Sequence, residues 1–182
     1  NIQGAGATLT VQETNGLAVD AANITTNDGD ISVTLAAGNL TGTGSIDAGS
    51  GHVDIEISGG GINLQNSPDQ ITGTNLTVKI NDLANVYFSS NVSTLALSAF
   101  GGGAVDILQT KDLTVGDTGA GSFSGIIATN STVTVNVTQG NLSVPAGHGI
   151  LAGQLGNVTL LTPSAAILFA PGSAVFADQL TF

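Results

Sequence analysis

The sequence of 182 residues has no cysteine, methionine, tryptophan or arginine, and its only basic residues are Lys79 and Lys111. The absence of cysteine excludes a disulfide framework and cysteine-ligated metal sites. Against 2 basic residues stand 13 acidic ones, which gives a net charge of −11. Because nucleic acids and anionic membranes are bound through lysine and arginine, this balance argues against both as partners.

Long apolar runs are also missing. The strongest, 165–170, is far shorter than the roughly 20 residues that a membrane-spanning helix needs, so we expect no membrane insertion. The chain begins at Asn1 without a basic segment followed by an apolar one, which favours a mature or excised segment. With 41% hydrophobic and 8% charged residues, it has the composition of a folded core rather than of a disordered tail.

Alternation of apolar and polar residues is frequent in the sequence. Apolar and polar residues alternate with a period of two in 31–35, 53–57, 76–80 and 133–137, which is typical of strands with one buried face. Glycine, asparagine and aspartate separate these runs and favour tight turns. Apolar residues at helical spacing are not sustained anywhere, and the chain has only two glutamates, Glu13 and Glu56. The sequence therefore predicts an all-β protein.

A short motif repeats along the chain: asparagine, then an aliphatic residue, then serine or threonine. It begins at Asn23, Asn39, Asn75, Asn91, Asn141 and Asn157. Successive asparagines are 16, 36, 16, 50 and 16 residues apart, which fits multiples of one short unit. We predict a single parallel β-helix, or β-solenoid, over residues 1–182, with coils of about 16–20 residues, ten or eleven coils in all, and asparagine side chains stacked in amide ladders.

With its Asn-Leu-Thr strand openings, its Gly-Gly turns at 59–61 and 101–103, and its lack of cysteine and basic residues, the chain resembles bacterial filamentous-haemagglutinin-type adhesins. These adhesins are exported by two-partner secretion, and related autotransporter passengers have a similar composition and repeat pattern. The resemblance implies a right-handed parallel β-helix, secretion to the bacterial cell surface, and adhesion that contributes to virulence. The secretion-domain signature of such proteins is absent, so the chain would be an inner repeat segment of a longer protein or a relative with a different use.

Two motifs raise the question of chemistry. Asp117-Thr118-Gly119 matches the triplet of aspartic proteases, but Gly116 replaces the usual apolar residue before it, and an ordinary turn explains it better. Asp28, Asp30 and the segment 47–54 offer carboxylates for Ca²⁺, although solvated turn aspartates are the simpler interpretation.

The two histidines, His52 and His148, have no second ligand or catalytic partner at a recognisable spacing, so surface or turn positions are favoured. We therefore assign no catalytic, cofactor-binding or metal-binding residue and expect neither an enzyme nor a cofactor. Eight Asn-x-Ser/Thr sequons, the six above with Asn130 and Asn136, allow glycosylation but follow from the repeat itself.

These observations favour a structural or adhesive rod that contacts a glycan or protein receptor on host or neighbouring cells. One alternative is a carbohydrate-active β-helix enzyme acting on polysaccharide, because the fold alone permits it. Another is a binder of ice or crystal surfaces through flat threonine rows, but Thr-x-Thr occurs only at Thr8, Thr41, Thr72 and Thr132.

Overall fold

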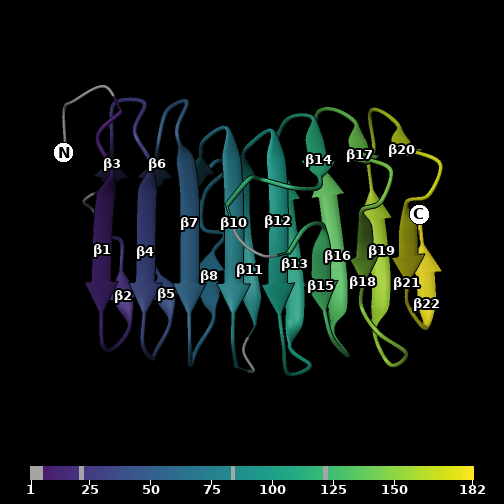
Figure 1. Cartoon of the computed structure of the whole chain (residues 1–182), viewed down its shortest axis with the longest axis horizontal. Helices are drawn as coiled ribbons and strands as arrows, with labels where there is room; N and C mark the ends of the chain where they lie inside the picture. Colours follow the sequence, from purple (N-terminus) through teal and green to yellow (C-terminus); the bar gives the residue numbers. More distant parts are fainter. Residues whose placement is uncertain (1–5, 21–22, 83–84, 121–122) are drawn as a thin grey trace.

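The computed structural model describes residues 6–20, 23–82, 85–120 and 123–182. Within these ranges the chain forms strands and no helix, so it holds no helix able to span a membrane. All pairings between these strands are parallel. The strands stack along the long axis as two sheets, one in front of the other (Figure 1). The prediction of an all-β parallel solenoid is confirmed.

The first sheet contains β1 (Leu9–Glu13), β4 (Ile31–Leu35), β7 (His52–Ile57), β10 (Asn75–Ile80), β12 (Thr94–Ala99), β14 (Leu113–Val115), β15 (Ile126–Ala128), β17 (Leu142–Val144), β18 (Gly149–Leu151), β20 (Ile167–Phe169) and β21 (Ala174–Phe176). The second contains β2 (Leu17–Ala18), β3 (Ile24–Thr25), β5 (Leu40–Thr41), β6 (Ile46–Asp47), β8 (Ile62–Leu64), β9 (Ile71–Thr72), β11 (Val86–Asn91), β13 (Ala104–Gln109), β16 (Thr132–Val137), β19 (Asn157–Leu161) and β22 (Gln179–Thr181).

The number of strands that each coil contributes to a sheet changes along the molecule. Up to β9 the first sheet has one continuous strand per coil and the second has two short ones; from β14 onward the pattern is reversed. Pro145 and Pro171 lie in the turns that split the later coils of the first sheet, where a residue without an N–H costs no ladder hydrogen bond. The late prolines therefore interrupt strands without ending the solenoid.

The coil is longer than the asparagine motif predicted. Leu9 pairs with Ile31 and Ile31 with Val53, each 22 residues on, and later offsets run from 19 (Leu76 to Leu95) to 29 (Leu97 to Ile126). The 16-residue spacing is wrong as a coil length because the motif does not recur at the same place in each coil: Asn23 and Asn39 precede β3 and β5, both in the second sheet, whereas other pairs lie on different sheets. For example, Asn75 begins β10 in the first sheet and Asn91 ends β11 in the second.

A longer coil means fewer coils than the ten or eleven expected. In the described part of the chain the first sheet runs through β1-β4-β7-β10-β12-β14-β17-β20, which is seven steps from coil to coil. At a strand spacing of about 4.8 Å, these steps extend about 34 Å.

The interior is a stack of aliphatic side chains. In β4 and β7 alternate residues are buried and the residues between them are partly exposed. The register places the buried residues of successive coils directly above one another, so each side chain packs against the same kind of side chain in the next coil. One such column consists of Val11, Val33, Ile55, Val78, Leu97, Ile126, Ile150 and Val175.

Asparagine and aspartate side chains link successive coils, but not as the amide ladder we expected. Asn39 Oδ1 accepts the Gly61 N–H at 2.9 Å and Asn141 Oδ1 accepts the Ala166 N–H at 3.0 Å. In the same way Asp112 Oδ1 accepts the Asn141 N–H at 2.7 Å. The amide ladder is wrong at these positions because the side-chain oxygen is used by a backbone N–H at the start of a strand in the next coil, a donor that the ladder itself leaves unpaired.

Candidate functional site

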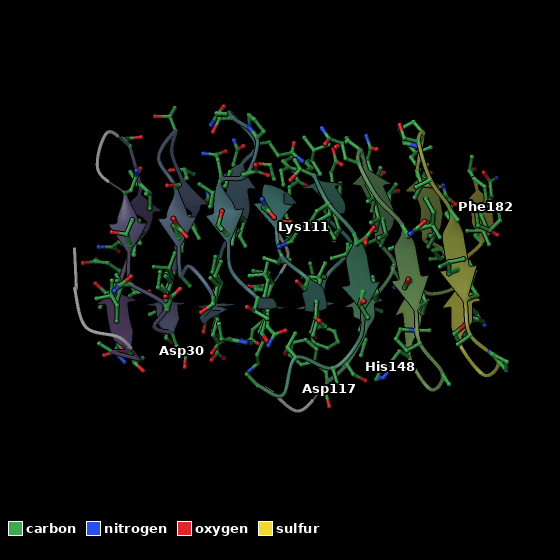
Figure 2. The ribbon with its side chains drawn as sticks, turned by 90° about the horizontal axis from the view of Figure 1, so that it is seen from above. Asp30, Lys111, Asp117, His148 and Phe182 are labelled. Carbon is green, nitrogen blue, oxygen red and sulfur yellow. The ribbon has the colours of Figure 1, made fainter. Side chains whose placement is uncertain are left out.

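Between β14 and β15 the chain makes an excursion, which the structure describes over residues 116–120 and 123–125. The single strand β12 pairs with both: Leu95 lies beside Val115, and Leu97 beside Ile126. The chain therefore leaves the first sheet after Val115 and rejoins it at Ile126, two positions further along β12. Figure 2 shows Asp117, in this excursion, on the same long side of the molecule as Asp30 and His148.

Where the excursion folds back, it borders a groove on the exterior of the first sheet, with a volume of about 430 Å³. The floor comes from β4, β7 and β10, because outward side chains of neighbouring strands share a face. One wall is the excursion itself. The lining residues are Thr8, Asp30, Ile31, Ser32, His52, Asp54, Asn75, Thr118, Gly119 and Ala120.

Thr77 fastens the excursion to the sheet. Its Oγ1 lies 2.6 Å from Thr118 Oγ1 and 3.1 Å from His52 Nε2, and it donates to the Ala120 carbonyl at 3.2 Å. A hydroxyl has one donor and two acceptor sites. Thr77 can therefore interact with Thr118, His52 and Ala120 together, and Thr118 Oγ1 also lies 3.3 Å from the Ala120 carbonyl oxygen.

The register brings three titratable groups together in the groove. His52 lies between Asp30 and Asn75 on neighbouring strands, and its backbone N–H donates to Asp30 Oδ1 at 2.8 Å. Asp54, two residues on, points to the same side and pairs with Ser32 and Thr77. The groove therefore combines carboxylates, an imidazole, an amide and hydroxyls on one sheet face.

Burial changes the protonation of these groups. Desolvation lowers the pKa of His52 below its usual range, and the nearby Asp54 and Asp30 carboxylates only partly oppose this. Desolvation also raises the pKa of Asp54; His52 and Lys79 pull it down, whereas Glu56 pushes it further up. The groove thus favours a neutral imidazole beside a carboxyl group that takes up a proton more readily than a free aspartate.

The pair Lys79–Glu56 flanks the groove on the same face. Lys79 Nζ donates to Glu56 Oε1 at 2.7 Å, and this bond is the main cause that lowers the pKa of Glu56. Both side chains are well exposed, 44% and 39%, so the pair adds little to stability. Its effect is to neutralise one of the two lysines of the chain.

The motifs singled out in the sequence are placed as follows. Asp117 Oδ1 accepts the Gly119 N–H at 2.8 Å, so Asp-Thr-Gly forms a turn, and its Thr118 anchors the excursion. Asp28 Oδ1 accepts the Ser50 N–H and Asp47 Oδ1 the Gly49 N–H, each at 2.9 Å. Their oxygens thus serve the backbone. The described residues contain no group of three or more histidine, aspartate or glutamate side chains arranged to hold a metal ion.

Sequence reasoning treated His52 as isolated, whereas the structure brings it beside Asp30 and Asp54. The error follows from the coil length, because only an offset of 22 residues places Asp30 next to His52. A signal was present: Gly29, Gly51 and Gly73 recur at 22-residue intervals, each just before an alternating apolar run. His148 lies in the turn between β17 and β18, outside the groove.

Comparison with known proteins gives no relative: no family model, curated protein or solved structure matches the chain.

Proposed function

We propose that this chain is a structural and adhesive rod segment of an exported bacterial surface protein that contacts glycans or proteins on host or neighbouring cells. One observation carries the proposal. The interior is a continuous aliphatic stack, while short polar side chains stand in register on the outside of the sheets. Such a body can hold many weak contacts in a fixed geometry, which is what attachment through repeated ligands requires.

The groove of Asp30, His52 and Asp54 supports a binding role. Asp30 Oδ1 and His52 Nε2 are already engaged within the protein, which fixes their positions. The remaining oxygens of the carboxylates and of Ser32 face the groove as acceptors for the hydroxyl groups of a ligand. With a net charge of −11, the chain favours neutral or basic partners over acidic ones.

The experiment is to present the purified, fluorescently labelled chain to a glycan array and to cultured epithelial and bacterial cells. We expect saturable binding with the glycan recovered unchanged, and weaker binding by Asp54→Asn. Asp178→Asn, which removes the same charge at an exposed turn after β21, serves as the matched control. Absence of binding to every glycan and cell tested would contradict the proposal.

A carbohydrate-active enzyme is the second candidate, and one observation favours it: a carboxyl group with a raised pKa, Asp54, shares a groove with Asp30. Glycosidases use such a pair, one carboxyl group protonating the leaving oxygen and the other activating water or attacking the sugar. Release of reducing ends from neutral polysaccharides, lost in both Asp54→Asn and Asp30→Asn, would establish this candidate in place of the adhesive rod.

A further inference from the structure

The exterior of the second sheet carries a separate hollow of about 390 Å³ beside Tyr87. Three strands build it. The register places Thr41 of β5, Asn63 of β8 and Tyr87 of β11 side by side. The residues two positions before these in the sequence also line the hollow: Asn39, Gly61 and Asn85. Two rows of three residues therefore form one patch across three coils.

The amide groups in this patch have a fixed orientation. Asn39 Oδ1 accepts the Gly61 N–H at 2.9 Å, and Asn85 Oδ1 accepts the Ala104 N–H at 3.0 Å. Because each oxygen is held by the backbone, each side chain presents its NH₂ group as the available donor. Gly61 lies between them in the row and has no side chain to fill the space. The result is a recess with amide donors on both sides.

Tyr87 gives the recess an apolar wall. It is the only tyrosine of the chain, which has no tryptophan, and it is partly exposed on the outside of β11. An aromatic ring of this kind offers a face with partial negative charge together with a polar hydroxyl. Asn63, exposed beside it, adds a further amide that can both donate and accept.

We infer that this recess binds one neutral pyranose unit of a glycan. The ring face of Tyr87 is complementary to the C–H groups on one face of the sugar, and the amides of Asn39, Asn63 and Asn85 are complementary to its hydroxyl rim. Acidic sugars are disfavoured, since no lysine is among the described lining residues and Asp106 follows Tyr87 in the same row. The inference rests on the proposed adhesive function and names its ligand class.

Tyr87 also makes the test unusually direct, because the intrinsic tyrosine fluorescence of this chain comes from that residue alone. The full chain is titrated with neutral hexose oligosaccharides and with uronate oligosaccharides of equal length, and affinity is measured in parallel by calorimetry. We expect a saturable fluorescence change with the neutral series only. By calorimetry we expect Tyr87→Ala to weaken binding on the order of tenfold, while Tyr87→Phe, which keeps the ring, stays within a few-fold of wild type.

Asp178→Asn, at the exposed turn after β21, is the control and should leave this affinity unchanged; circular dichroism confirms that each variant is folded. Glycan binding that is unaffected by Tyr87→Ala, or a preference for uronates, would overturn the inference while leaving the adhesive rod intact. Absence of any glycan or cell binding by the wild-type chain would overturn both.

Discussion

At the scale of single residues, His52 is the side chain whose environment departs most from what the sequence suggests. It is half-buried, hydrogen-bonded to Thr77 and faced by Asp30 and Asp54. Desolvation prevails over both carboxylates and lowers the pKa of the imidazole. Protonation of His52 is therefore less favourable in the folded chain than in the unfolded one, despite the acidic surroundings.

This difference makes stability depend on pH with a defined sign. As the pH falls below about 6.5, the unfolded chain binds a proton at His52 before the folded chain does, so the free energy of unfolding decreases. Because water screens a half-buried ring, we expect a loss below about 1 kcal/mol. Denaturant unfolding at several pH values should show a flatter profile for His52→Gln, and the slopes should converge above about pH 8. Identical slopes throughout would contradict the assignment.

At the scale of elements, the turns before β4, β7 and β10 stack as closely as the strands do. Gly29, Gly51 and Gly73 occupy these turns. A Cβ atom on Gly51 would lie 2.3 Å from the Gly29 carbonyl oxygen, and one on Gly73 would lie 3.0 Å from the Gly51 oxygen. These glycines are needed for close approach of backbone to backbone rather than for a left-handed conformation.

Gly51→Ala should therefore destabilise the chain by about 1–3 kcal/mol, because the coils must move apart to admit the methyl group. Gly59, in the turn after β7, is the matched control: its nearest atoms would be 3.9 Å from an added Cβ, so Gly59→Ala should change stability by less than about 0.5 kcal/mol. Chemical denaturation of both variants measures the difference. Equal effects of the two substitutions would show that the turns do not restrict the stacking.

The strands of this fold could be predicted from the sequence, whereas the length of its coil could not. Alternation identified 31–35 and 76–80 as strands because it depends only on neighbouring residues, and β4 and β10 confirm it. The coil length could not be obtained from the asparagine motif, which occurs on both faces of a coil. The groove at His52 and the recess at Tyr87 depend on that length, since each combines residues about 22 apart, and so neither was predicted.

At the scale of the whole molecule, the strands are buried in the middle of the solenoid and exposed near its last coil. All but the first residue of β12 are buried, whereas every residue of β22 is exposed. Leu168, Phe176 and Phe182 expose half or more of their surface near this end. In a stacked array each coil is stabilised mainly by the coils it touches, so local opening should start at the last strands.

Hydrogen exchange followed by mass spectrometry tests this gradient. Backbone amides in β10 and β12 should exchange most slowly, and those in β20, β21 and β22 faster by at least about two orders of magnitude. The expected profile is graded, with each coil nearer the end less protected than the one before. Uniform protection along the chain would instead indicate a single cooperative unit.

The excursion between β14 and β15 bears on how well this fold tolerates insertions. Since Val115 and Ile126 pair with Leu95 and Leu97 of the same strand, β12, the parallel pairing of the first sheet resumes after an intervening segment of ten residues. We therefore expect a segment of different length to be tolerated here without a change in strand register, provided that it keeps the anchor of Thr118 on Thr77. Variation in this segment would alter one wall of the groove while the stacked framework keeps its register.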